Sequence, residues 1–154
     1  MADRPSDERR IVRLRFASHP DLFVLARLVL TGIAVAEGLS SQVVSDLKLA
    51  VTEACSNAIQ HAAANSARLG TDGSGQEICV SYLIDPGLIT IAVADSNAGV
   101  EPIALHTVAR NPADHSDETS LSVIESLVDD LSFVSDRTGS RVTFKKRFEV
   151  QPAT

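Results

Sequence analysis

Hydrophobic and polar residues alternate along several segments with a period of two, which is typical of half-buried strands. The first such segment is 10–17, where valine, leucine and phenylalanine alternate with arginine. Segments 77–84 and 88–95 alternate in the same way, and the Asp-Pro-Gly turn between them indicates a hairpin. Segments 131–135 and 140–149 are predicted as a final pair of strands.

Two other segments repeat their apolar residues at the spacing of a helix. Residues 21–37 are predicted as a helix, with Ser18 as its cap, a proline in its first turn and Gly38 at its end. Its predicted apolar face consists of Leu22, Leu25, Leu28, Val29 and Ile33. Residues 120–130 are amphipathic in the same sense and are predicted as the last helix.

The longest periodic segment, residues 41–63, is predicted as one helix capped by either of two adjacent serines at its start. Its apolar positions are Val43, Val44, Leu47, Ala50, Val51, Ala54, Ala58 and Ile59. Glu53, Asn57 and His61 follow each other in steps of four, and each step advances only about 40° beyond a full turn. They therefore share one face, where a carboxylate base and an amide ligand for a hard cation suit a metal–phosphate site. For His61, local packing within the fold is the favoured interpretation.

The order of elements predicts an α+β fold, a two-layer sandwich of one mixed, mostly antiparallel sheet with its helices on one face. A chain of 154 residues is expected to form one domain, placed at 10–150 after a flexible tail at 1–9. Residues 64–76 are predicted as a loop because they are rich in glycine and small polar residues. Residues 96–118 form a long segment with two prolines, as expected of a functional lid or a disordered loop.

Charge is distributed unevenly along the chain, although the net charge is only −6. Residues 1–15 carry five arginines, and residues 137–147 carry five basic residues and no acid. The middle, 16–136, carries four basic residues against sixteen acids. This balance argues against direct nucleic-acid binding. The basic ends are interpreted as solvated strand faces, with a docking surface for an acidic partner as the alternative.

The cysteines and the hydropathy pattern indicate the compartment. Cys55 and Cys79 fall inside a predicted helix and a predicted strand without metal-ligand spacing, so both are expected to be free and buried. No apolar run follows Met1, and no stretch is long enough to span a membrane. We therefore expect a cytoplasmic protein with no membrane partner.

The order of elements and the motif LKLAVTEACSNAIQHA at 47–62 resemble the Bergerat-fold (GHKL) ATPases. Within them, the chain is most similar to the bacterial anti-sigma-factor serine kinases of the RsbW and SpoIIAB type, over residues 10–148. This resemblance implies a homodimer that binds ATP and Mg²⁺ and sequesters a sigma factor. It also implies phosphorylation of a serine or threonine of an anti-anti-sigma partner of the STAS type.

The resemblance also implies roles for individual residues. Glu53 matches the family's catalytic base, and Asn57 matches its magnesium ligand. Asp95 matches the aspartate that accepts the adenine amino group, and Gly99 matches a glycine that lets the ring approach the backbone. Ser140 matches a hydroxyl residue that supports Asp95 and adenine.

One further match concerns protein partners, and one departure from the family's phosphate loop leaves an alternative open. Arg27 matches a helix arginine that faces protein partners, and Thr119 and Ser120 offer hydroxyls to the phosphates at a helix N-terminus. The family's Gly-x-Gly-Leu phosphate loop, however, is Glu-Thr-Ser-Leu at 118–121. The favoured function is an ATP-dependent protein serine/threonine kinase. The alternative is a binding module on the same fold with weak or no nucleotide binding.

Overall fold

The computed structural model describes residues 8–70, 75–95, 115–136 and 139–150. Its helices and strands follow one another in the predicted order. They are β1 (Arg10–Ala17), the 3-10 helix η1 (Pro20–Leu22), α1 (Phe23–Glu37), α2 (Ser41–Leu69), β2 (Glu77–Asp85), β3 (Leu88–Asp95), α3 (His115–Leu127), β4 (Asp130–Asp136) and β5 (Gly139–Arg147). No helix in these ranges combines the length and the apolar character needed to cross a bilayer.

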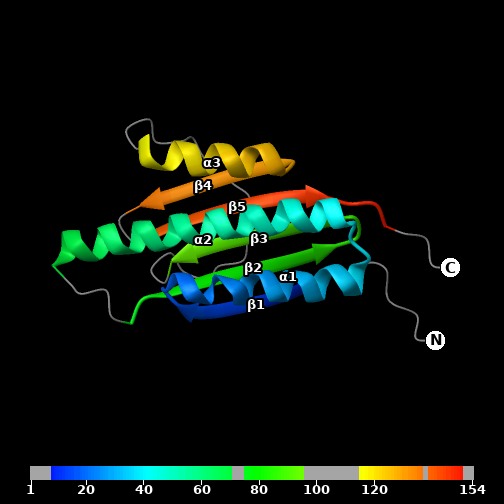
Figure 1. The fold of residues 1–154 in the computed structure, drawn as a ribbon, viewed down its shortest axis with the longest axis horizontal. Coiled ribbons are helices and arrows are strands. Elements are labelled where there is room, and N and C mark those ends of the chain that lie inside the picture. The colour runs from blue at the N-terminus through cyan, green and yellow to red at the C-terminus, as the bar shows by residue number, and fades with distance from the viewer. Residues whose placement is uncertain (1–7, 71–74, 96–114, 137–138, 151–154) are drawn as a thin grey trace.

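The strands form one five-stranded sheet in the order β1-β2-β3-β5-β4. All four pairings between described strands are antiparallel. The sequence analysis allowed a mixed sheet, but none of these pairings is parallel. The three α-helices lie over one face of this sheet, and α2 crosses its middle (Figure 1). The predicted α+β two-layer architecture is confirmed.

The core lies between the helices and the covered face of the sheet. Its largest fully buried side chains include Leu30 of α1, Leu47 of α2, Tyr82 of β2, Ile124 of α3 and Phe144 of β5. Helices α1, α2 and α3 and strands β2, β3 and β5 each contribute a fully buried side chain, and β1 adds the buried Phe16. Each fully buried large apolar side chain stabilises the fold by roughly 1.5–3 kcal/mol. The long helix α2 packs against β2, β3 and β5, which fixes the position of its polar stripe relative to the sheet.

The start of the first helical segment differs from the prediction. Ser18 is not its cap; instead, the Nδ1 atom of His19 accepts a hydrogen bond from the backbone N–H of Asp21 at 3.2 Å. Pro20 fixes the backbone there in a 3-10 turn, so the α-helix begins only at Phe23. The predicted end is confirmed, because Gly38 closes α1 in the left-handed conformation with φ of 70°.

The buried face of α1 agrees with the prediction only in part, since Ile33 is buried and Leu22 and Val29 pack against the core, but Leu25 and Leu28 do not belong to it. The side that meets the core carries Ala26, Leu30 and Ile33, whereas Leu28 is 60% exposed and Leu25 36% exposed. The physical reason is a close approach of helix and sheet, because the small Ala26 lets the hydroxyl of Tyr82 reach its carbonyl oxygen at 2.7 Å. Helical periodicity alone did not distinguish this face from the neighbouring leucine-rich one.

Tyr82→Phe should test this link between α1 and β2. The variant keeps the ring in the core but removes a buried hydrogen bond to the Ala26 carbonyl. We expect a loss of about 1 kcal/mol in the free energy of unfolding, measured by urea denaturation. Phe144→Leu serves as a control for general core perturbation, since it should also change packing but leave the hydroxyl bond intact. An unchanged unfolding midpoint for Tyr82→Phe would show that the bond contributes nothing.

Helix α2 is longer than predicted. Ser40 caps its start, where the hydroxyl accepts a hydrogen bond from the backbone N–H of Val43 at 3.2 Å, as one of the two predicted serines should. Its end was predicted at 63, but the helix continues to Leu69 and Gly70 terminates it with φ of 72°. The alanine-rich sequence here favours the helix, and the amide of Gln76 donates to the hydroxyl of Ser66, which anchors the additional turns.

The last helix begins earlier than predicted. Helix α3 starts at His115 rather than at residue 120 and ends at Leu127. The segment 116–120 is therefore helical backbone rather than a loop before the helix. In an α-helix only the first four backbone N–H groups lack an internal partner, so those of Thr119 and Ser120 fall beyond the free N-terminal donors.

Candidate functional site

The polar stripe of α2 contains a buried amide without a partner. Asn57 is only 1% exposed, and neither its Oδ1 nor its Nδ2 atom has a hydrogen-bond partner among the described residues. An amide left in this state costs about 1–3 kcal/mol relative to one that is hydrogen-bonded. The position therefore fits a group that supplies the missing partners when it binds.

Glu53 lies one turn before Asn57 on the same face of α2. Its side chain is half-buried, and it makes no hydrogen bond or ion pair within the described parts of the chain. Ala54 and Ala58 flank the stripe and are buried in the core.

His61, the third member of the stripe, packs against the sheet. Its ring lies 5.8 Å from the ring of Phe133 on β4, with the two planes tilted by 43°. This contact supports the packing role expected for His61 and joins α2 to the edge of the sheet. The sequence offered no signal for this pair, because the two residues belong to segments that meet only in the folded chain.

Asp95 closes β3 and is held by β5. The residue is 4% exposed, and its Oδ2 atom accepts a hydrogen bond from the backbone N–H of Ser140 at 3.2 Å. Because Ala94 pairs with Arg141 in the antiparallel ladder, Asp95 lies beside the first residues of β5. The resemblance implied that the hydroxyl of Ser140 supports Asp95. In the structure the contact comes instead from the backbone amide of Ser140.

The two parts of the candidate site lie at the same end of the molecule. The carboxyl end of β3, the start of β5, the C-terminal half of α2 and the start of α3 all point to one side (Figure 1). A ligand at this end can meet a carboxylate at a strand end and an amide on a helix. Among the described residues, no group of three or more His, Cys, Asp or Glu side chains could hold a metal ion alone. One amide oxygen nevertheless suits Mg²⁺, which binds through few protein oxygens plus phosphates and waters.

Three predicted site residues are not placed by the described geometry. Gly99 lies outside the described residues. Thr119 and Ser120 belong to the backbone of α3, but their side chains also fall outside what the structure describes. Their contacts with phosphate therefore remain predictions.

The side chain of Arg27 on α1 reaches α2 and is partly buried there. Its guanidinium Nη1 atom donates to the hydroxyl of Thr52 at 3.4 Å, and Thr52 in turn donates to the carbonyl of Lys48 at 2.8 Å. Its predicted contact with protein partners is neither supported nor opposed by this position. The sequence analysis did not predict the hydrogen bond between Arg27 and Thr52.

The cysteines are free and buried, as predicted. Burial raises the pKa of the Cys55 thiol to about 12, and the nearby positive charge of Arg27 offsets part of this effect. The thiol of Cys55 is therefore protonated and unreactive at neutral pH. It belongs to the core and not to the candidate site.

Comparisons with known proteins identify the family of the chain. Residues 16–146 match the family model described as a histidine kinase-like ATPase domain. The serine-protein kinase RsbW of Listeria monocytogenes serovar 1/2a is 30% identical over 142 residues, which cover 87% of this chain and 85% of that protein. The serine-protein kinase RsbW of Bacillus pumilus is 33% identical over 91 residues, which cover 59% of this chain but only 53% of that protein.

A solved structure shares the fold. The RsbU and RsbW domains of Rv1364c from Mycobacterium tuberculosis align with a TM-score of 0.62 over 92% of this chain. The aligned region is 34% of that chain, and the identity is 19%. At this identity the likeness establishes the arrangement of helices and strands and does not extend to activity.

Proposed function

The chain belongs to the histidine kinase-like ATPase domain family and groups with its RsbW-type members, and on that premise we propose that it is an ATP-dependent protein serine kinase. In this proposal it binds ATP with Mg²⁺ and transfers the terminal phosphate to a serine or threonine of an anti-anti-sigma partner. It also sequesters a sigma factor, so that phosphorylation decides which partner it holds. The functional domain is taken as residues 10–150.

The observation that carries the proposal is the buried, unpartnered amide of Asn57. A Mg²⁺ ion would neutralise charge on the triphosphate and offer a ligand position to the amide oxygen. The amide nitrogen can donate to a phosphate oxygen or to water. Because both amide atoms gain partners in this arrangement, nucleotide binding removes the free-energy cost of burying the amide without hydrogen bonds.

Glu53 is assigned the role of general base. Phosphoryl transfer needs positioning and charge neutralisation, together with a group that accepts the proton of the attacking hydroxyl. Glu53 stands one helical turn from Asn57, which brings the base close to the phosphate that Asn57 would help to hold. Its lack of a hydrogen bond or ion pair within the described residues leaves the carboxylate available to a substrate hydroxyl.

Asp95 is assigned the recognition of adenine. A carboxylate accepts hydrogen bonds only, so it suits the amino group of adenine and opposes the carbonyl oxygen that guanine carries at the same position. One of its oxygens is already fixed by the backbone of Ser140, which orients the group at the end of β3.

Asp95→Asn should weaken ATP binding by about tenfold and narrow the preference for ATP over GTP. The amide can turn its donor toward guanine, which the carboxylate cannot do. Calorimetric titrations with each nucleotide, in the presence of Mg²⁺, measure both effects. Asp85→Asn is a suitable control because Asp85 closes β2 and pairs with Arg9 on the surface. An unchanged ratio of ATP to GTP affinity in Asp95→Asn would contradict the assignment.

A second candidate function is a partner-binding module on the same fold without catalysis. The early start of α3 favours it, because the helix incorporates residues 118–120 where the family has a glycine-containing phosphate loop. Glu118 also adds a negative charge to this segment. Both candidates share the sigma factor and the STAS-type protein as partners, a homodimeric state and a cytoplasmic location in bacteria. They differ in phosphate transfer, which only the kinase performs.

A further inference from the structure

Helix α3 ends at a cluster of polar contacts with β5. The carbonyl oxygen of its last residue, Leu127, accepts a hydrogen bond from the ammonium Nζ atom of Lys146 at 2.9 Å. The backbone N–H of Asp129 donates to the carbonyl oxygen of Lys145 at 2.9 Å, and a carboxylate oxygen of Asp129 accepts from the backbone N–H of Arg147 at 2.6 Å. Three consecutive residues of β5 therefore hold the end of α3 and the turn that follows it.

The ammonium group of Lys146 also faces α2. Its Nζ atom lies 3.6 Å from the Oδ2 atom of Asp46, near the start of that helix. The other carboxylate oxygen of Asp46 accepts a hydrogen bond from the side-chain amide of Gln42 at 2.9 Å. The side chains of Lys146 and Asp46 are only 18% and 20% exposed. One side chain of β5 thus joins the end of α3 to the start of α2, and we call this contact between Lys146, Asp46 and the Leu127 carbonyl the α2–α3 junction.

Lys146 occupies a position where the alternation of β5 places core residues. Val142 and Phe144 lie four and two residues earlier on the same face, and both are buried in the core. An ammonium group on this face loses part of its hydration, which costs free energy unless the charge is paired. A buried ion pair adds little stability relative to apolar residues of similar volume. Stability alone therefore does not account for a lysine at this position.

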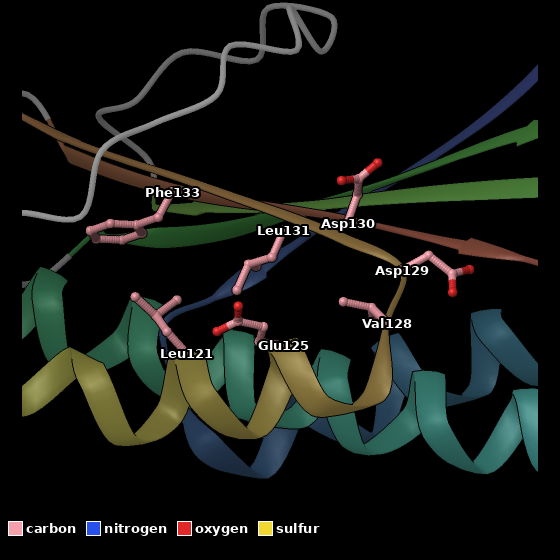
Figure 2. A pocket seen from close by; sticks show the side chains of 7 residues that line it. All are labelled: Leu121, Glu125, Val128, Asp129, Asp130, Leu131 and Phe133. Atoms are coloured by element: carbon pink, nitrogen blue, oxygen red, sulfur yellow. The ribbon is translucent and has the colours of Figure 1, made fainter.

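The end of α3 receives its positive charge from outside the helix. The last four carbonyl groups of an α-helix lack internal partners and form the negative end of its dipole. The last turn of α3 has no basic residue. Figure 2 shows Glu125 on α3 and Asp129 in the turn that leads into β4, and both add a carboxylate near this end. Lys146 supplies a donor and an opposite charge where the helix itself has neither.

Apolar packing holds α3 firmly on one side only. Leu121 and Ile124 are buried in the core that α3 shares with α2. On the other side, a groove of about 240 Å³ separates the helix from β4, where Leu131 and Phe133 line it (Figure 2). Side chains across a gap lose the attractive contacts that close packing provides. The tilt of α3 over the sheet is therefore set less by β4 than by the α2–α3 junction.

The α2–α3 junction lies away from the candidate site, but on the same two helices. Figure 1 shows the start of α2 and the end of α3 toward the side of the molecule opposite to the end of β3. Further along, α2 carries Glu53 and Asn57, and α3 carries residues 118–120 near its start. Leu127 lies about 12 Å along the helix axis from Thr119. A tilt of α3 about its fixed end would therefore change the distance between residues 118–120 and the polar stripe of α2.

We propose that Lys146 is a positioning residue of the candidate nucleotide site. By holding the end of α3 against the start of α2, it sets how closely residues 118–120 approach Asn57. Lys146 is not assigned a contact with the nucleotide and acts through α3. The inference rests on the proposed function, because it takes residues 118–120 as the segment that meets the phosphates.

The test is the double variant Lys146→Met/Asp46→Asn. It removes both charges together, so that no buried carboxylate is left unpaired and the unfolding midpoint in urea stays close to that of the wild type. We expect its affinity for ATP with Mg²⁺ to fall by about tenfold. Its affinity for adenosine, which has no phosphate, should be unchanged. Hydrogen exchange of the α3 amides without nucleotide should become faster, while that of β2 and β3 stays the same.

The matched control is Lys145→Met/Asp130→Asn, which makes the same two changes in a pair that is adjacent in the ladder of β4 and β5. These side chains belong to the other face of the sheet, so this variant should bind ATP as the wild type does. Lys146→Arg keeps the charge and the donors and should retain most of the affinity.

The outcomes separate this inference from the proposed function. If the wild type binds no ATP, the proposed function fails and the role of Lys146 fails with it. If the wild type binds ATP and Lys146→Met/Asp46→Asn binds it equally tightly, only the role of Lys146 is wrong. Equal losses of affinity in the two double variants, or an equal loss for adenosine, would reduce the effect to a general disturbance of the fold and overturn the proposal.

Discussion

Glu53→Gln is expected to lower the rate of phosphate transfer to the partner by about 10²- to 10⁴-fold, the usual contribution of a general base. Glutamine has nearly the same shape as glutamate but cannot accept the proton of the attacking hydroxyl. Because Glu53 is not assigned a contact with the nucleotide, the affinity for ATP should change little. The measurement is transfer of labelled phosphate from ATP to a purified STAS-type protein from the same organism.

The control for this prediction is Glu77→Gln, which removes the same charge from an exposed position at the start of β2. It should transfer phosphate at the wild-type rate. If the wild type transfers phosphate and Glu53→Gln transfers it equally fast, Glu53 is not the base. If the wild type binds ATP and the partner but transfers nothing, the partner-binding module is the correct function.

Asn57→Leu is expected to change nucleotide binding and stability in opposite directions. Leucine has the same branching as asparagine and no polar atoms, so it removes the buried amide whose two atoms lack partners. The free energy of unfolding without nucleotide should rise by about 1–3 kcal/mol. The affinity for ATP with Mg²⁺ should fall by about 100-fold or more, since a ligand of the metal is lost.

The comparison for Asn57→Leu is Gln60→Leu, on the same helix but at an exposed position. This variant should change the stability by less than about 0.5 kcal/mol and leave nucleotide affinity unchanged. Urea denaturation gives the stability, and calorimetric titration gives the affinity. A marked loss of stability in Asn57→Leu would indicate that the amide of Asn57 is needed by the fold itself, which would contradict its assignment to a ligand.

The sequence predicted those parts of the fold where local signals agree. In α2, helical periodicity, a capping serine and the spacing of Glu53 and Asn57 all indicate one helix with one polar face, and the structure has this arrangement. The hairpin of β2 and β3 was also predicted closely, because alternation and an Asp-Pro-Gly turn specify the same register.

The differences arise where tertiary contacts decide between local alternatives. Leu25 and Leu28 have the spacing of a buried face, but the close approach of Ala26 to Tyr82 turns the helix so that Leu28 is 60% exposed and Leu25 36% exposed. The end of α2 depends on a contact beyond the local sequence, that of Gln76 with Ser66. Periodicity does not contain this information.

The candidate site was predicted in its residue types and only partly in its contacts. Asn57 and Asp95 were chosen from the resemblance to the ATPase family, whereas their burial became evident only in the folded chain. The backbone of Ser140 holds Asp95 because of the register between β3 and β5, which no single segment reveals.

The central claim is that the end of the molecule formed by α2, β3 and β5 binds a magnesium nucleotide through Asn57 and Asp95. Calorimetric titration of the wild-type protein with ATP, in Mg²⁺ and again in EDTA, tests this claim most directly. We predict one nucleotide per chain, an affinity that falls sharply in EDTA, and weak binding by Asn57→Leu under both conditions. Absence of heat and of any nucleotide-dependent stabilisation of the wild type would contradict the account.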